Sequence, residues 1–207
     1  MSQIRIASIV EGDGEVAAVP VLLRRYANLV GWPGRLLALL PIRQPASRLL
    51  RSGKLERIVE LAVRKLGGPG GVFVLLDCDD NCPATLGPCL LERVHRASRG
   101  FPVALVLAHR EYEAWFLGAA PSIAGKRNLP NHLPPHPRPE SVRGCKEWLS
   151  SQMPRGAAYN EVEDQPALTD EFNFDMARSA CPSFDKCHRE LMDLLQRVAL
   201  ITPGFLV

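Results

Sequence analysis

The first strand-like stretch of the chain reads Ile4-Arg5-Ile6-Ala7-Ser8-Ile9-Val10, and Glu11-Gly12-Asp13-Gly14-Glu15 follows directly. An apolar run of this kind is typical of a strand that is buried on both faces of a sheet. A second such run, residues 72–76, is followed by Asp77-Cys78-Asp79-Asp80. Both runs therefore deliver carboxylates at their C-terminal ends, where open α/β sheets bind their ligands.

Three of these carboxylates, Glu11, Asp77 and Asp79, should converge on one point if the two strands are neighbours. Like charges at such distances repel unless a cation neutralises them. Oxygen ligands suit a hard ion, so we expect Mg²⁺ or Mn²⁺. Each carboxylate alone also has a structural explanation, because Asp77 could cap the next helix and Glu11 could be solvated. The set as a whole, and the Asp-x-Asp spacing, favour the cation.

Strand and helix patterns alternate around these two motifs. The expected strands are residues 4–10, 36–40, 72–76 and 102–107, and the expected helices between them are 16–30, 53–66 and 84–98. This alternation predicts an α/β fold with a mostly parallel four-stranded sheet and helices on both faces.

The second half of the chain has a different composition. Residues 110–117 should open another helix, residues 119–155 are rich in proline and predict a long loop or lid, and residues 183–199 predict a last helix. We therefore divide the chain into an α/β domain, residues 1–118, and a loop-rich, helical C-terminal extension, residues 119–207, packed on the same core.

Composition sets wide bounds on function. The formal charge of +3 neither demands nor excludes nucleic acid as a partner. The N-terminus lacks a signal-peptide pattern, and no apolar run approaches the roughly 18 residues of a membrane span. Six cysteines in a chain without an export signal predict reduced thiols. These features together predict a cytoplasmic protein without a membrane partner.

The motifs Glu-Gly-x-Gly-Glu at residues 11–15 and Asp-x-Asp at residues 77–79 resemble those of the Toprim domain. That domain occurs in topoisomerases, primases, recombination-repair proteins and nucleases of the "overcoming lysogenization defect" (OLD) type. The resemblance implies a four-stranded parallel sheet, with Glu11 as the loop glutamate and Asp77 and Asp79 as the aspartate pair. In the OLD-type nucleases a second glutamate of the first motif takes part in metal binding, and Glu15 matches it.

The whole chain is similar to a family of small uncharacterised bacterial Toprim-like proteins, often encoded beside ATPase genes. The similarity is carried by residues 110–117, 159–160 and 177–184. One feature departs from the Toprim pattern, because a glycine commonly follows the Asp-x-Asp motif and Asp80-Asn81-Cys82-Pro83 stands here instead. We expect Asp80 either to substitute as a ligand or to cap the following helix.

The leading hypothesis is hydrolysis of phosphodiester bonds in nucleic acid, with water as the nucleophile and Mg²⁺ or Mn²⁺ as cofactor. The catalytic residues would be Glu11, Asp77 and Asp79. The metal ligands would be these three together with Glu15 and Glu113, although Glu113 could instead cap a helix or face solvent.

Basic residues after the second strand suit contacts with a phosphate backbone, and the candidates are Arg43, Arg48 and Lys54. A solvated helix face explains the same residues. The expected partners are DNA or RNA and an ATPase encoded nearby, in phage defence or DNA repair. The alternative is a non-hydrolytic module that uses Mg²⁺ to bind a nucleic acid or nucleotide, or that serves the ATPase. The sequence leaves open whether the chain is a homodimer.

Overall fold

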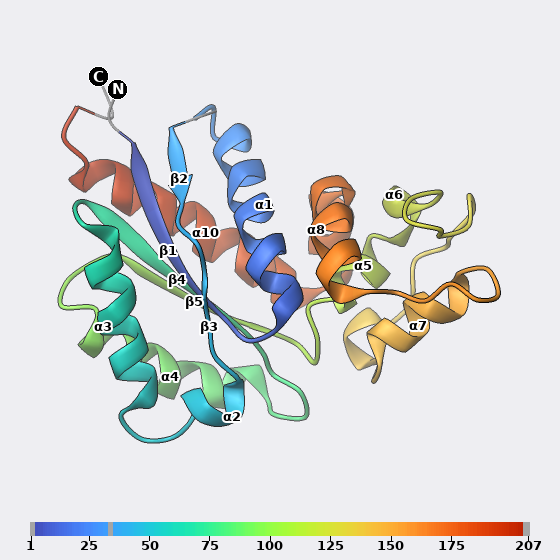
Figure 1. Cartoon of the computed structure of the whole chain (residues 1–207), viewed down its shortest axis with the longest axis horizontal. Coiled ribbons are helices and arrows are strands. Elements are labelled where there is room, and N and C mark those ends of the chain that lie inside the picture. Colours follow the sequence, from blue (N-terminus) through green and yellow to red (C-terminus); the bar gives the residue numbers. More distant parts are fainter. Residues whose placement is uncertain (1–2, 33–34, 205–207) are drawn as a thin grey trace.

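The computed structural model describes residues 3–32 and 35–204. The first two residues of the predicted α/β domain and the last three of the predicted extension therefore lie outside the described residues. Its centre is a five-stranded sheet in the order β2 (Leu36–Ala38), β1 (Ile4–Val10), β4 (Gly70–Asp77) and β5 (Val103–Ala108), with β3 (Ile42–Arg43) also paired to β1 (Figure 1). All of these pairings are parallel. The predicted α/β fold with a parallel sheet is confirmed.

The single strand expected over residues 36–40 is wrong in detail. Two short strands, β2 and β3, pair with β1 in succession, and Pro41 lies between them. A proline has no N–H to donate to a strand ladder, so the pairing is interrupted there. The sheet accordingly has five strands instead of four.

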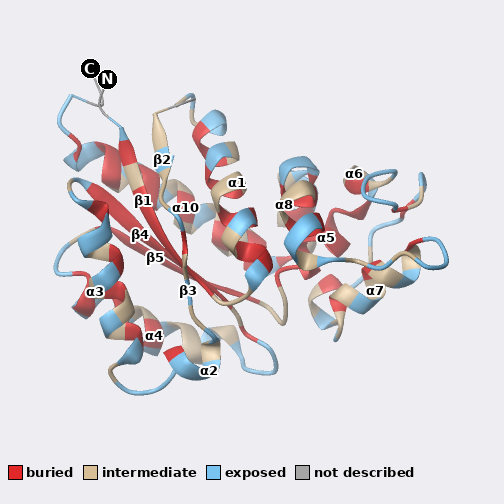
Figure 2. Ribbon diagram, in the orientation of Figure 1, coloured by how far each residue is buried: buried red, intermediate tan, exposed pale blue. Residues whose placement is uncertain are grey.

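Helices cover both faces of the sheet. The helices α1 (Asp13–Leu29) and α10 (Pro182–Ile201) lie on one face, and α3 (Lys54–Leu66) and α4 (Pro83–Ala97) lie on the other. Successive strand side chains alternate between these layers, so that Ile6 and Phe73 face α1 and α10 while Ile9 and Val74 face α3 and α4. The strands are therefore buried on both sides (Figure 2).

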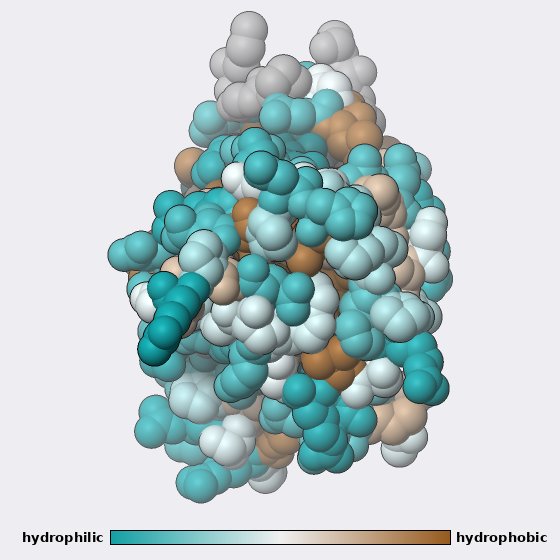
Figure 3. All heavy atoms as spheres, turned by 90° about the vertical axis from the view of Figure 1, so that its right-hand side faces the viewer, coloured by the Kyte–Doolittle hydropathy of each residue, from teal (hydrophilic) through white to brown (hydrophobic). Residues whose placement is uncertain are grey.

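The helical extension contains more regular structure than its composition suggests. After α5 (Ala114–Gly118), which lies within the predicted α/β domain, the extension comprises α6 (Ala120–Ile123), a short 3₁₀ turn η1 (Pro139–Ser141), α7 (Cys145–Gln152), α8 (Glu161–Glu171) and α9 (Phe174–Ala180), followed by α10. The expectation of a long loop over residues 119–155 is therefore wrong in part, since Leu129, Leu133 and Leu149 belong to the core. The end of the molecule that carries α6 and α7 presents mainly hydrophilic side chains (Figure 3).

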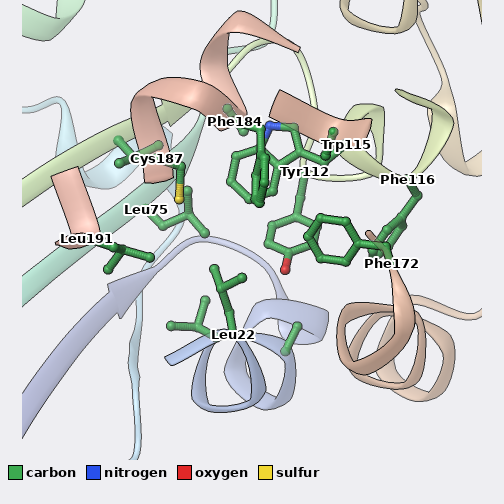
Figure 4. Close-up of a cluster of buried hydrophobic side chains, with 14 of the residues drawn as sticks. Leu22, Leu75, Tyr112, Trp115, Phe116, Phe172, Phe184, Cys187 and Leu191 are labelled. Atoms are coloured by element: carbon green, nitrogen blue, oxygen red, sulfur yellow. The ribbon is translucent and has the colours of Figure 1, made fainter. Parts of the chain in front are cut away.

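An aromatic cluster joins this extension to the sheet (Figure 4). Tyr112, Trp115 and Phe116 pack against Phe172 and Phe184, with ring centroids 4.6 to 5.5 Å apart. The polar atoms of two of these rings are satisfied by hydroxyl groups of α8 and α10, at 2.9 Å in each case. The segment from residue 110 to 117 is thereby held beside the ends of β4 and β5.

Two helix boundaries differ from expectation. Helix α1 begins at Asp13, so Pro20 lies inside it instead of near its start. The helix expected from residue 110 begins only at Ala114, because Arg110 has a φ of +67° and residues 112–113 form a turn.

All six cysteines are free thiols, as predicted. Within residues 3–32 and 35–204, none of the helices has both the length and the apolar character that a bilayer span requires.

Candidate active site

Three predicted residues do meet at the C-terminal edge of the sheet. Because β1 and β4 are neighbours, Glu11, Asp77 and Asp79 line one cavity of about 260 Å³. Its other walls come from α2 (Ala46–Leu49), with Ala46 and Ser47, and from apolar residues of α4. The convergence expected from the strand order is thus observed.

Glu11 is a half-buried carboxylate at the end of β1. Burial raises its pKa, as do the charges of Asp79 and Glu15, while backbone N–H groups of Ala46 and Asp77 partly offset the shift. Its Oε2 is shielded from solvent and has no hydrogen-bond partner among the described residues. Such an oxygen is costly to bury unless a proton or a cation satisfies it.

Asp77 ends β4 and accepts a hydrogen bond from the N–H of Tyr112 at 3.0 Å. Burial raises its pKa well above the ordinary value, and the charges of Glu15, Glu113 and Glu11 raise it further. The capping role left open for this residue is wrong, because Cys82 occupies the N-cap position of α4. Asp77 instead lies at the centre of an acidic cluster, which consists of Glu11, Glu15, Asp77, Asp79 and Glu113.

Asp79 lies at the exposed mouth of the cavity. Its φ of +47° falls in the left-handed region that residues other than glycine rarely adopt, and its N–H donates to the carbonyl of Arg110 at 3.1 Å. Backbone strain of this kind clusters at functional sites.

Glu15 and Glu113 lie behind Asp77, where α1 meets α8. One oxygen of Glu15 accepts the N–H of Gly12, as in a helix capping box, and the other lies 3.5 Å from Nε2 of Gln165. The same Nε2 donates to Oε1 of Glu113 at 3.0 Å, and the hydroxyl of Tyr159 donates to that oxygen, also at 3.0 Å. Gln165 therefore bridges the two carboxylates.

Glu113 is fully buried. Glu113 stands at the N-cap position of α5, but its side chain is buried and makes no capping hydrogen bond, so it neither caps the helix nor faces solvent. Its Oε2 is buried, and no described residue bonds to it. Burial raises the pKa of Glu113 to about 7, against the opposing effect of the charge of Lys146. A carboxylate of this kind changes its charge near neutral pH.

Lys146, on α7, is the cation of this inner group. It pairs with Glu161 of α8. Burial alone would lower its pKa, but the charge of Glu113 and the bond to Glu161 more than offset this, so the pKa lies above its ordinary value. One lysine faces several carboxylates here, so the cluster keeps a negative charge.

The cluster fits a hard divalent cation in its chemistry. Its donors are carboxylate oxygens, two of them buried without a partner, and the mutual repulsion of their charges would be relieved by a cation. Across residues 3–32 and 35–204, no three His, Cys, Asp or Glu side chains are already arranged as a metal-binding group.

Gly14 allows α1 to approach α8 closely enough for this arrangement. A Cβ at this position would lie 2.5 Å from Oε1 of Gln165 and 2.7 Å from the backbone oxygen of Glu161. We expect Gly14→Ala to push the helices apart and destabilise the protein by about 1–3 kcal/mol in chemical denaturation. Gly87→Ala is the matched control, because Gly87 also lies inside a helix, α4, and the nearest atom to its Cβ would be 3.9 Å away. Helix propensity predicts that this control is stabilising, so equal losses in both variants would contradict the close-packing role.

The three basic candidates lie beside the site without lining its cavity. Arg43 pairs with Asp13 at 2.9 Å, Arg48 lies exposed on α2, and Lys54 begins α3. In the part of the chain that the structure describes, none of the three lines the cavity.

Several residues of the site were not anticipated. Gln165, Tyr159 and Lys146 contact the acidic cluster, and all three come from the helical extension. A local signal existed for α8, because the Asn160 side chain accepts the N–H of Val162 and acidic residues fill the first turn.

Comparison with known proteins assigns the chain to a family. A family model described as a domain of unknown function (DUF4276) matches residues 10–192, a range that includes the whole acidic cluster. No curated protein and no solved structure matches the chain.

Proposed function

The chain belongs to the DUF4276 family, and from its site we propose that it is a Mg²⁺- or Mn²⁺-dependent nuclease with a Toprim-type active site. The observation that carries this proposal is the orphaned, buried oxygen of Glu11 in a cavity shared with Asp77 and Asp79. Carboxylates at the ends of adjacent parallel strands are placed where α/β enzymes bind their ligands.

Glu11, Asp77 and Asp79 would hold the cation, and Glu15 and Glu113 would hold a second. When bound, the ion supplies positive charge that lowers the pKa of an attacking water and stabilises the leaving oxygen. As an alternative to holding the cation, Glu11 would be the general base that accepts the proton of that water.

Cleavage assays of the purified full-length chain test this function. Supercoiled plasmid, single-stranded DNA and RNA should each be incubated with Mg²⁺, with Mn²⁺ and with EDTA. We expect cleavage of at least one substrate in the presence of a divalent cation and none in EDTA. Absence of cleavage under all conditions would contradict the nuclease, and metal-dependent binding without cleavage would support the non-hydrolytic module instead. An ATPase partner belongs to the same proposal and rests on the resemblance alone.

A further inference from the structure

A carboxylate next to the acidic cluster, Asp80, has cationic partners of its own. Its Oδ1 lies 2.7 Å from Nη1 of Arg110 and 2.8 Å from Nη2 of Arg143, and its Oδ2 lies 3.0 Å from Nη1 of Arg143. The capping role expected for Asp80 is wrong, because Cys82 holds the N-cap position of α4, while the role of Asp80 as a metal ligand stays a prediction. Asp80 alone balances only one of the two guanidinium charges; of the other carboxylates at this place, Glu111 is engaged by the backbone N–H groups of Gly144 and Cys145.

Hydrogen bonds fix the backbone at or next to both arginines. Arg110 follows β5, its carbonyl accepts the N–H of Asp79, and its Nε is shielded from solvent without a partner among the described residues. Arg143 precedes α7, whose first N–H groups, from Gly144 and Cys145, donate to the carboxylate of Glu111. Glu111 thus fixes the start of α7 against the end of β5.

A cavity lies at this arginine pair. It has a volume of about 180 Å³ and is lined by Asp79, Asp80, Arg110, Glu111 and Arg143. Asp79 also lines the cavity that contains Glu11 and Asp77. An anion bound to the two arginines would therefore lie directly beside the candidate metal ligands.

We infer that Arg110 and Arg143 form a phosphate-binding pair, and that the Asp80 carboxylate occupies this pair until a substrate phosphate displaces it. The guanidinium fork binds carboxylates and phosphates with the same paired geometry. The Asp80 side chain is 64% exposed, so its carboxylate can turn into water when it is displaced. The identity of the phosphate rests on the proposed function: it is a backbone phosphate of the nucleic acid next to the one that is cleaved.

The pair also places positive charge beside a site that would otherwise repel a polyanion. A polyanionic strand is repelled by the acidic cluster, and Lys146 is already paired with Glu161. Arg143 is 71% exposed and Arg110 is 23% exposed, so both are accessible to a strand that approaches Asp79. Charge-assisted bonds of this kind fix the register of a backbone without reading its sequence.

Inorganic phosphate is a direct probe of this inference. In ¹H–¹⁵N spectra of arginine Nε–H groups, we expect the signals of Arg110 and Arg143 to move and saturate as phosphate is added to the metal-free protein. Asp80→Asn removes the competing carboxylate and should lower the half-saturating phosphate concentration about tenfold. Arg143→Gln removes one fork and should raise that concentration, measured at Arg110, by about tenfold.

An exposed pair elsewhere provides the control. Arg96 bonds to Glu92 on α4 at 2.6 Å, and both side chains are more than 70% exposed. We expect its signal to stay still, and Glu92→Gln to leave the phosphate response of Arg110 unchanged. Movement of all three arginine signals in parallel, or no movement at Arg110 and Arg143, would overturn the inference. Thermal unfolding of each variant shows whether a change in binding reflects a change in folding.

The same measurements separate this inference from the nuclease proposal. Saturable phosphate binding at the pair in a chain that cleaves nothing would retain the phosphate site and reject the nuclease. If the chain cleaves nucleic acid but the Arg110 and Arg143 signals do not respond to phosphate, the nuclease proposal stands and the phosphate-binding role of the pair is wrong. If both hold, Arg143→Gln should raise the KM for nucleic acid more than it lowers kcat.

Discussion

Asp77→Asn should abolish metal-dependent cleavage and at the same time stabilise the metal-free protein. The asparagine keeps the shape of the side chain, and its oxygen can still accept the N–H of Tyr112. It removes a buried charge that Glu15, Glu113 and Glu11 oppose. Loss of residues that merely orient metal ligands costs about 10–100-fold, so loss of a direct ligand should cost more than about 100-fold in kcat/KM.

Two measurements on the same preparation check this prediction, namely initial cleavage rates with Mg²⁺ and thermal unfolding in EDTA. Each kcal/mol of relieved repulsion would raise the midpoint by about 2–4 °C in a protein of this size. Asp193→Asn is the matched control, because Asp193 pairs with Arg197 on α10 and is 59% exposed. A variant at residue 77 that still cleaves would show that the site is wrong. Lost activity together with lost stability would indicate a structural role for Asp77.

Glu11→Gln tests the carboxylate that β1 contributes to the same site. An amide cannot accept the proton of an attacking water, and it brings a weaker donor set to a cation. We expect a loss of cleavage comparable to that of Asp77→Asn, without loss of folding.

The outer half of the site could be predicted because it depends on strand order alone. The apolar runs of β1 and β4 identify buried strands, and parallel strands place the residues after them at one edge. Glu11 and Asp77 therefore had to be close once the two strands were neighbours.

The inner half depends on contacts between distant segments, which local patterns do not reveal. Lys146 lies on α7, whose start is capped by Glu111, a residue of the segment before the predicted loop. Helix α8 carries Gln165, but Pro166 directly after it obscures the helical pattern that Asn160 begins. Over residues 119–155, proline-rich composition predicted a loop where the structure has α6 and α7.

The arginine pair was hidden for a related reason. Arg110 and Asp79 both have positive φ values, and their side chains point where an extended strand would not direct them. A sequence pattern that predicts a strand or the start of a helix does not indicate positive φ values at these positions. The contact between Arg110 and Asp80 appears only when β4 and β5 are placed side by side.

Glu113 gives the last prediction, a loss of stability with rising pH that a divalent cation reverses. In the folded protein its pKa is about 7, compared with an ordinary value of 4.5. Between these values the folded state binds more protons than the unfolded state, so the free energy of unfolding falls as pH rises. The full difference corresponds to about 3 kcal/mol, present at pH 4.5 and lost above pH 7.

Chemical denaturation in EDTA at a series of pH values measures this effect, and Glu113→Gln isolates it. His188 has a lowered pKa because of burial, which changes stability in the opposite direction, but this contribution is common to both proteins. The difference between wild type and variant should therefore change with pH even if the wild-type curve alone is shallow. Parallel curves would show that Glu113 does not titrate near neutral pH.

Added Mg²⁺ or Mn²⁺ connects this titration to the proposed cofactor. At pH 8 Glu113 is charged, since this pH lies above its pKa of about 7, and a cation at about 100 times its dissociation constant should add about 2.7 kcal/mol of stability. At pH 5 protons compete for the same oxygens, so the gain should be much smaller. Equal stabilisation at both pH values, or an undiminished gain in Asp77→Asn, would place the cation elsewhere on the protein. A gain confined to high pH and lost in that variant would locate the cation at the carboxylates around Asp77, independently of any cleavage assay.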